Sequence, residues 1–246
     1  MMLPLSGVSV LVTRPVHQAA QLVGAIEKAG GRAVCFPVIG IGEVEDDSKL
    51  KSLLSRLSGF DIAIFVSANA VQKAMERIAS LPDAMRVFAV GRSTLSALQA
   101  CGVKGIAPEK QDSEGLLELL VDVSGSRIVI FRGEGGREKL AEELQSRGAA
   151  VEYAECYRRV IPEQTQKIAP QDFAAVTATS GESVKNLLEM TGKWILEKPI
   201  FVPHERIGEM ARKTGFERVF VTRAGDEGLV EGLIGWYQIG EMHGNG

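Results

Sequence analysis

Six short polar segments stand directly after apolar runs, and they contain most of the side chains that could do chemistry. The segments are Thr13-Arg14-Pro15, Ser67-Ala68-Asn69, Gly91-Arg92-Ser93-Thr94, Arg132-Gly133-Glu134-Gly135, Thr179-Ser180-Gly181 and Pro203-His204-Glu205. When apolar runs form parallel strands and helices follow them, such segments meet at the carboxyl edge of a sheet, where open α/β sheets bind ligands. Helix starts present unpaired N–H groups and a partial positive charge there. The pattern therefore predicts a binding site for an anion.

The charged and hydroxyl side chains of these segments each allow two interpretations. Arg14 and Arg132 directly follow apolar runs, where a guanidinium could reach the carboxylate of a ligand. The alternative for each arginine is an ion pair with a local Glu. Ser67, Ser93 and Ser180 stand where helix N-caps are expected, and capping alone would explain each of them.

Tyr157 lies in the run Glu155-Cys156-Tyr157-Arg158-Arg159, within an extended segment that is a candidate linker. A tyrosine near a hinge can donate a proton, although its reference pKa of about 10 makes it a weak acid. The alternative is a tyrosine that packs through its ring and turns its hydroxyl to solvent.

Several other kinds of site are not supported. The histidines at 17, 204 and 243 are scattered, with no second His or Cys at metal-binding spacing, so no metal site is predicted. The run Gly133-Glu134-Gly135-Gly136 resembles a phosphate loop, but Glu138 occupies the last glycine position of GxGxxG, and Gly-Lys-Ser/Thr is absent. The chain also lacks the Gly-x-Ser-x-Gly elbow of serine hydrolases.

Short apolar runs and helical patterns alternate along the chain. The runs span residues 8–12, 61–66, 87–90, 128–131, 174–178, 200–202 and 219–221. Continuous β-branched runs of this length suit strands that are buried on both faces, as in a parallel sheet. The apolar residues that follow them repeat at helical spacing. The pattern predicts an α/β fold with open parallel sheets, ending in a disordered tail over 240–246.

The chain contains an internal duplication. Residues 60–120 align without a gap with residues 173–233 at a shift of 113, which pairs Ser67 with Ser180. A second set of matches at a shift of 118 pairs Arg14 with Arg132. A duplicated unit predicts two similar lobes and a ligand-binding cleft between them. The repeat alone does not settle whether the first βα units are exchanged between the lobes.

Composition narrows the class of protein further. The net charge of −3 offers no basic surface for nucleic acid or an anionic membrane. The N-terminal residues lack the basic and apolar regions of a signal peptide, and no apolar stretch approaches the roughly 20 residues of a membrane span. Three cysteines without a CxxC pair suit reduced thiols. We expect a cytoplasmic protein.

The chain resembles the uroporphyrinogen-III synthases through motifs that occur in the family's order. The opening is similar at Val10-Leu11-Val12-Thr13-Arg14-Pro15 and Phe36-Pro37-Val38-Ile39. Further similar motifs are Phe65-Val66-Ser67-Ala68-Asn69-Ala70-Val71, Val90-Gly91-Arg92-Ser93-Thr94, Ser113-Glu114-Gly115-Leu116-Leu117, Arg132-Gly133 with Gly136-Arg137, Tyr157-Arg158-Arg159 and Thr179-Ser180-Gly181-Glu182-Ser183-Val184. Each motif is loose, but their joint order and spacing are specific and cover nearly the whole chain.

The resemblance implies a fold of two similar α/β lobes with parallel sheets flanked by helices, flavodoxin-like, joined by a two-stranded linker. In this arrangement the first βα unit packs into the lobe made by the C-terminal segment. The implied lobe one comprises residues 1–36 plus 164–246, and lobe two comprises residues 43–151. Residues 37–42 and 152–163 are the implied linker strands.

The resemblance also implies an activity. The family closes the linear tetrapyrrole hydroxymethylbilane to uroporphyrinogen III in heme biosynthesis, with loss of water and inversion of the terminal pyrrole ring through a spiro intermediate. It uses no cofactor and no metal. A tyrosine at the position of Tyr157 is the family's leading candidate for the acid, so we expect Tyr157 to be catalytic.

The remaining expectations concern binding. The expected substrate-binding residues are Arg14, Ser67, Ala68, Asn69, Gly91, Arg92, Ser93, Arg132, Gly133, Thr179, Ser180, Gly181 and His204. The expected partner is hydroxymethylbilane, with no nucleic acid and no membrane. We expect a monomer that makes at most transient contact with the preceding pathway enzyme. The alternative from another class is a non-enzymatic two-lobed binding protein for an anionic small molecule; such proteins are commonly exported, and no export signal is visible.

Overall fold

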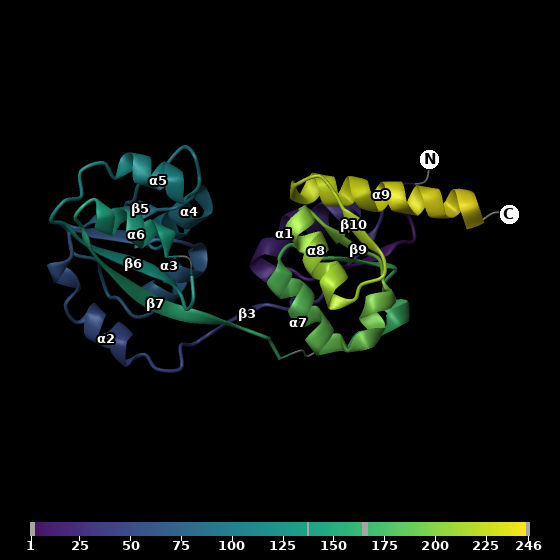
Figure 1. Cartoon of the computed structure of the whole chain (residues 1–246), viewed down its shortest axis with the longest axis horizontal. Helices are drawn as coiled ribbons and strands as arrows, with labels where there is room; N and C mark the ends of the chain where they lie inside the picture. The colour runs from purple at the N-terminus through teal and green to yellow at the C-terminus, as the bar shows by residue number, and fades with distance from the viewer. Residues whose placement is uncertain (1–2, 137, 164–166, 245–246) are drawn as a thin grey trace. The chain divides into compact units, whose positions relative to one another are not determined.

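The computed structural model of the chain describes residues 3–136, 138–163 and 167–244 (Figure 1). The chain folds into two compact units. Unit 1 comprises Met1–Gly40 and Val160–Gly246, and unit 2 comprises Ile41–Arg159. Each unit contains a sheet with helices on both faces, and the two units are described separately.

The sheet of unit 1 has the strand order β10-β9-β8-β1-β2, and its neighbouring strands pair in parallel. The strands are β1 (Ser9–Val12), β2 (Arg32–Cys35), β8 (Ala175–Thr177), β9 (Ile200–Val202) and β10 (Val219–Val221). Helices α1 (Val16–Lys28) and α9 (Gly225–Gly244) pack on one face. Helices α7 (Gly181–Thr191) and α8 (Glu205–Thr214), with the short η2 (Pro170–Asp172) and η3 (Lys193–Glu197), belong to the other side.

The sheet of unit 2 has the order β3-β7-β6-β4-β5. Its strands are β3 (Gly40–Gly42), β4 (Ile62–Phe65), β5 (Arg86–Ala89), β6 (Arg127–Gly133) and β7 (Ala150–Val160). One face is covered by α2 (Ser48–Leu54), η1 (Leu57–Gly59), α3 (Ala68–Met75) and α4 (Arg92–Ala100). The other is covered by α5 (Ser113–Leu119) and α6 (Lys139–Ser146) (Figure 1).

Strand β4 shows why a continuous apolar run suits this architecture. All four of its residues are buried. Ile62 and Ile64 pack with α5 and α6, whereas Ala63 and Phe65 pack with α2, α3 and α4. A strand in the middle of a parallel sheet covered on both faces has no side that can carry polar residues. The predicted α/β class with parallel sheets is confirmed.

The duplication in the sequence is also a duplication in structure. The shift of 113 relates β4 to β8, α3 to α7, α4 to α8 and α5 to α9, and the shift of 118 relates β1 to β6 and α1 to α6. Strand β1 lies between β2 and β8, so the first βα unit shares a sheet with the C-terminal segment.

The prediction of a disordered tail over 240–246 is wrong as far as Gly244. Helix α9 runs through Gly244, and the last two residues lie outside the described part of the chain. The tail composition, rich in glycine and polar residues, misled the prediction because α9 carries apolar residues ahead of the tail that pack on the sheet, including Leu229 and Leu233. Tertiary packing of the first turns lets the helix continue past a weak end.

The core of unit 2 predicts a stability change. Phe131 is fully buried and stacks on Phe65 with 4.4 Å between ring centroids. Truncation by Phe131→Ala should lower the free energy of unfolding by about 3–5 kcal/mol, because it removes apolar contacts and leaves a cavity. Urea unfolding followed by circular dichroism measures this change.

The matched control is Val121→Ala, because Val121 is 76% exposed. It should change the free energy of unfolding by no more than about 0.5 kcal/mol. Equal effects of the two substitutions would contradict the assignment of Phe131 to the core.

Candidate active site

The six polar segments lie between strands and helices. In unit 2, residues 67–69 lie at the start of α3 after β4, residues 91–93 lie at the start of α4 after β5, and Arg132 and Gly133 end β6 ahead of α6. In unit 1, Arg14 follows β1, residues 179–181 join β8 to α7, and His204 joins β9 to α8. Each set therefore stands at the carboxyl edge of its own sheet, where helix starts concentrate N–H groups.

A register shift between β6 and β7 determines where Tyr157 lies. Arg132 pairs with Glu155, but the next residue, Gly133, pairs with Tyr157, so Cys156 is an extra residue in β7. Alternation would send Cys156 and Tyr157 to opposite faces. The irregularity places both side chains in the core cluster below α3 and α4. Tyr157 therefore belongs to unit 2, with 4% of its surface exposed.

The Tyr157 hydroxyl lies 3.1 Å from Oγ of Ser67, and either oxygen can be the donor. The same Ser67 Oγ accepts a hydrogen bond from the backbone N–H of Ala70 at 3.1 Å, which makes Ser67 the N-cap of α3. The partial positive charge at the start of α3 therefore lies beside the hydroxyl pair and stabilises negative charge there. The Tyr157 ring packs in the core, as the alternative interpretation expects, but the hydroxyl contacts Ser67 and is not turned to solvent.

The Tyr157 ring occupies space that is free because Gly133 has no side chain. A Cβ atom at position 133 would lie 2.6 Å from Cε2 and 2.7 Å from Cζ of Tyr157, closer than carbon atoms can pack. The backbone N–H of Glu134 also donates to the Tyr157 carbonyl at 2.8 Å. Gly133 therefore lies at the carboxyl edge, as predicted, and packs directly against the Tyr157 ring. The sequence alone did not indicate this contact.

Packing around Tyr157 predicts the reactivity of the neighbouring thiol. Cys156 is buried, and burial raises the pKa of its thiol to about 12, whereas Cys35 and Cys101 are exposed. A thiol with a raised pKa holds almost no reactive thiolate at about pH 8. Ellman's reagent should therefore modify Cys35 and Cys101 in the folded protein and Cys156 only after unfolding.

Single-cysteine variants identify which thiol reacts. Rapid reaction of Cys156 in the folded protein would contradict the packing described around Tyr157.

Arg132 is nearly buried, with 5% of its surface exposed. Its Nε donates to the Gly133 carbonyl at 3.2 Å and its NH2 group to the Gly136 carbonyl at 2.9 Å. The guanidinium also lies over the Tyr153 ring, 4.1 Å from the centroid, and within 3.5 Å of a Glu155 carboxylate oxygen. Arg132 therefore fixes the turn that follows β6, and Glu155 is the local acidic partner expected as the alternative.

The equivalent arginine of unit 1 has a different partner. Arg14 forms an ion pair of 2.6 Å with Asp226, and its Nε donates to Thr179 Oγ1 at 3.4 Å. Asp226 lies in the first turn of α9, where an acidic residue is favourable, and it was not among the predicted site residues. The sequence feature that could have identified Asp226 is an acidic residue at the start of a predicted helix, shortly after an apolar run.

The other predicted residues of unit 1 surround two helix starts. Ser180 caps α7, accepting from the Ser183 N–H at 3.0 Å while Ser183 Oγ accepts from the Ser180 N–H at 3.1 Å. Gly181 is the first residue of α7, and His204 is the exposed N-cap residue of α8. Capping is thus a role of Ser180.

The remaining predicted residues of unit 2 lie at the starts of α3 and α4. Ala68 and Asn69 are the first residues of α3, and Gly91 is the N-cap residue of α4. Arg92 and Ser93 are exposed in the first turn of α4, so the interpretation of Ser93 as a helix N-cap is wrong. The Arg92 N–H donates to Gln111 Oε1 at 3.2 Å, a contact that the sequence did not indicate.

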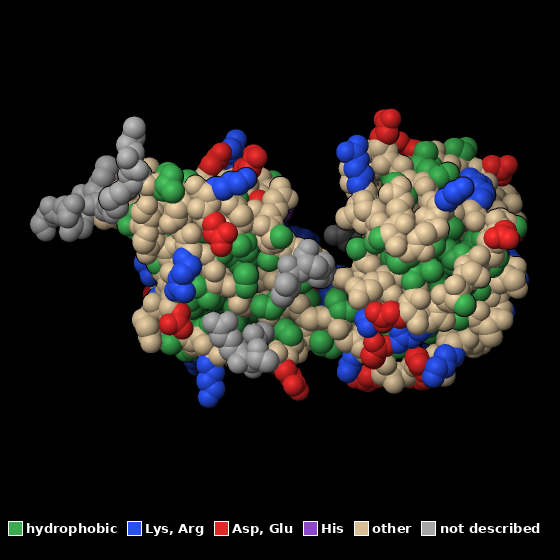
Figure 2. Space-filling view, turned by 180° about the vertical axis from the view of Figure 1, so that it is seen from behind, with side chains coloured by type: hydrophobic (Ala, Val, Ile, Leu, Met, Phe, Trp, Pro, Cys, Tyr) green, Lys and Arg blue, Asp and Glu red, His purple; other side chains and the backbone are tan. Residues whose placement is uncertain are grey.

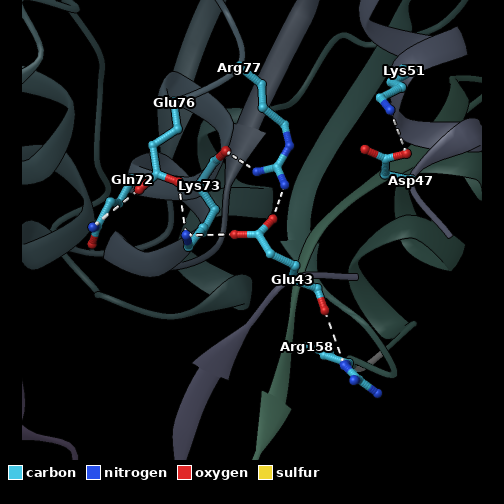
Figure 3. A network of polar contacts seen from close by, with 8 residues as sticks. All are labelled: Glu43, Asp47, Lys51, Gln72, Lys73, Glu76, Arg77 and Arg158. Carbon is cyan, nitrogen blue, oxygen red and sulfur yellow. Dashed lines mark hydrogen bonds and ion pairs between the residues drawn. The ribbon is translucent and has the colours of Figure 1, made fainter. Parts of the chain in front are cut away.

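An ion-pair cluster ties the chain that follows β3 to α3 (Figure 3). Glu43 accepts a hydrogen bond from Lys73 Nζ at 2.9 Å and pairs with Arg77, while Arg158 Nε donates to the Glu43 carbonyl at 3.1 Å. The hydrogen bonds from Lys73 and Arg77 hold the pKa of the Glu43 carboxyl below its ordinary value. The cluster fixes the C-terminal end of α3, the helix that Ser67 caps at its N-terminal end.

Charges of both signs are mixed on the face shown in Figure 2, where lysine, arginine, aspartate and glutamate side chains lie among apolar and neutral ones. Within the described ranges, no group of three or more His, Cys, Asp and Glu side chains could hold a metal ion. None of the helices described here combines the length and apolar character needed to cross a membrane.

Comparisons with known proteins agree on one family. The family model described as uroporphyrinogen-III synthase HemD matches residues 20–231. The uroporphyrinogen-III synthase of Escherichia coli K12 is 31% identical over 247 aligned residues, which cover 92% of this chain and 99% of the relative. That of Proteus mirabilis is 36% identical over 160 residues, covering 62% of this chain and 80% of the relative.

Solved structures support the fold. The uroporphyrinogen-III synthetase of Helicobacter pylori superposes with a TM-score of 0.60 at 11% identity, covering 93% of this chain and 99% of that one. A mutant uroporphyrinogen III synthase of Thermus thermophilus gives a TM-score of 0.56 at 18% identity, covering 94% of this chain and 98% of that one. The family match spans most of the chain and the Escherichia coli relative aligns almost end to end, so this chain belongs to the uroporphyrinogen-III synthase family.

Proposed function

We propose that this protein is an enzyme with the activity for which its family is named. It closes hydroxymethylbilane to uroporphyrinogen III, with loss of water and inversion of the terminal pyrrole ring through a spiro intermediate. The observation that carries the proposal is the match of the family model over residues 20–231. This match favours the synthase over the alternative of a non-enzymatic binding protein for an anionic small molecule.

Tyr157 is the proposed acid. Loss of water requires a proton for the departing hydroxyl, and a positioned side chain that supplies it accelerates the step. Ser67 orients the Tyr157 hydroxyl at 3.1 Å, and Gly133 leaves room for the ring. Among the predicted site residues, Tyr157 combines a phenolic O–H that can donate a proton with a fixed, buried position.

The proposed substrate is a polyacid, and local groups bind its carboxylates. A net charge of −3 gives no overall attraction for an anion. Helix starts offer N–H groups and partial positive charge, so the first residues of α3, α4, α7 and α8 are the proposed contacts. They include the predicted residues Ala68, Asn69, Gly181 and the exposed Arg92.

The enzyme then chooses one ring closure over another by holding the chain of pyrroles in position. We propose that it works without a cofactor, in the cytoplasm and as a monomer, with transient contact with the preceding pathway enzyme at most. Within residues 37–42 and 152–163, the proposed linker between the lobes is limited to the places where the chain passes from one unit to the other, at Gly40–Ile41 and Arg159–Val160.

The assay supplies hydroxymethylbilane to the purified protein, oxidises the product and separates isomers I and III. We expect isomer III in excess, because spontaneous closure gives the uninverted isomer I. Isomer I at the level of a protein-free control would refute the proposed function.

Tyr157→Phe should slow formation of isomer III by about 10²-fold or more, because it removes the proton donor and keeps the ring. Tyr237→Phe is the matched control: the Tyr237 hydroxyl donates to the Ser6 carbonyl, and both residues belong to unit 1, whereas Tyr157 belongs to unit 2. The control should keep the parent rate. A Tyr157→Phe rate within a few-fold of the parent would remove Tyr157 from the mechanism.

A further inference from the structure

A cavity of about 220 Å³ lies within unit 2, on the face of the sheet opposite Tyr157. It is lined by Val66, Val90, Ser113, Glu114, Ile130, Arg132, Gly136, Lys139, Leu140 and Tyr153. Val66 and Val90 directly follow β4 and β5, so the cavity lies at the carboxyl edge, beneath the starts of α5 and α6. Neither the proposed acid nor the proposed contacts at the helix starts account for it.

The cavity wall contains an incompletely paired polar group. The Tyr153 hydroxyl is buried, and no described residue accepts its proton. The neighbouring Arg132 guanidinium stacks on the ring and cannot accept the phenolic proton, because arginine carries only donors. Burial raises the pKa of Tyr153, and the charge of Arg132 opposes this shift. The phenol stays protonated at neutral pH and can donate to an acceptor in the cavity.

The internal duplication allows the surroundings of Arg132 in unit 2 to be compared with the equivalent position in unit 1. Arg14, the counterpart of Arg132, pairs at 2.6 Å with Asp226 at the start of α9. The counterpart of Asp226 in unit 2 is Ser113, which has no charge and lines the cavity. In unit 2 the carboxylate beside the arginine comes instead from Glu155 on β7, and the position equivalent to Asp226 is left to the short Ser113 side chain at the cavity.

The remaining walls define the shape of an occupant. Val66, Val90, Ile130 and Leu140 give apolar sides. The polar groups are those of Arg132, Lys139, Tyr153 and Ser113 and the carboxylate of Glu114, which is paired with Lys139. Pockets for whole ligands span roughly 300–1,000 Å³, so this cavity suits one ring with short substituents. The cationic groups favour a carboxylate on that ring.

We propose that this cavity binds one carboxylate-bearing pyrrole ring of the substrate, with the carboxylate accepting a hydrogen bond from Tyr153 and occupying the place that Asp226 fills in unit 1. The identification of the ligand as a pyrrole rests on the proposed function. Lys139 forms an ion pair of 2.8 Å with Glu114, and both residues line the cavity. The incoming carboxylate competes with Glu114 for Lys139.

The test measures binding of a monopyrrole that carries one acetate and one propionate, by titration calorimetry with the full-length protein. The parent should bind it, and Tyr153→Phe should weaken binding by about 10-fold, since a hydrogen bond to a charged group contributes about 1.5–3 kcal/mol. Ser113→Asp should abolish binding, because it supplies the internal carboxylate of unit 1. Glu114→Gln should tighten binding several-fold by releasing Lys139 from its partner.

Tyr237→Phe is again the matched control and should bind like the parent. Tyr153→Phe should fold normally, because it removes a buried hydroxyl without a partner for its proton. Thermal unfolding checks each variant. Absence of monopyrrole binding to the parent, or equal binding by parent, Tyr153→Phe and Ser113→Asp, would overturn the proposal.

The isomer assay separates this proposal from the proposed function. With hydroxymethylbilane, Tyr153→Phe should raise KM about 10-fold and leave kcat near the parent value, unlike Tyr157→Phe, which lowers kcat. A protein that forms isomer III but binds no monopyrrole would refute the cavity assignment alone. A protein that forms only isomer I would refute the proposed function, whatever it binds.

Discussion

One extra residue in β7 determines which side chains can act together in unit 2. Because Gly133 pairs with Tyr157 while Arg132 pairs with Glu155, two successive side chains of β7 enter the same core cluster. Without this irregularity, Tyr157 would share the face of Glu155 and Arg132. With it, the Tyr157 hydroxyl reaches Ser67 at the start of α3, and the opposite face is left to Arg132 and Tyr153. The two faces thus have separate polar groups at one sheet edge.

The two arginines illustrate how a duplicated fold can diverge in chemistry while it keeps its architecture. Both guanidiniums have internal partners: Arg14 pairs with Asp226, and Arg132 donates to the carbonyls of Gly133 and Gly136. Arg14 is thus occupied within unit 1, whereas Arg132 shapes the turn after β6 and also lines the cavity beside Tyr153.

Much of the fold could be predicted from the sequence. Apolar runs locate strands because a parallel strand covered on both faces must be apolar throughout, as β4 is. The repeat predicts that helix starts recur in equivalent places, and Ser67 and Ser180 indeed cap α3 and α7. These features depend on local pattern, which a single sequence contains.

The parts that could not be predicted depend on contacts between distant residues. Alternation along β7 gives no warning of the irregularity at Cys156, so the sequence could not indicate the contact between Tyr157 and Ser67, 90 residues apart. The partner of Arg14 lies far along the chain on α9, and only the sheet order brings the two together. The partners of Arg14, Arg132 and Tyr157 could therefore be identified only from the structure.

The close approach of Gly133 to the Tyr157 ring makes these two positions dependent on one another during evolution. A side chain at 133 is compatible only with a smaller residue at 157, since a Cβ would meet the ring at 2.6 Å. Relatives that keep the aromatic ring should keep the glycine, and relatives that have lost the ring are free to vary at both places. The pair should therefore change together when sequences of the family are compared.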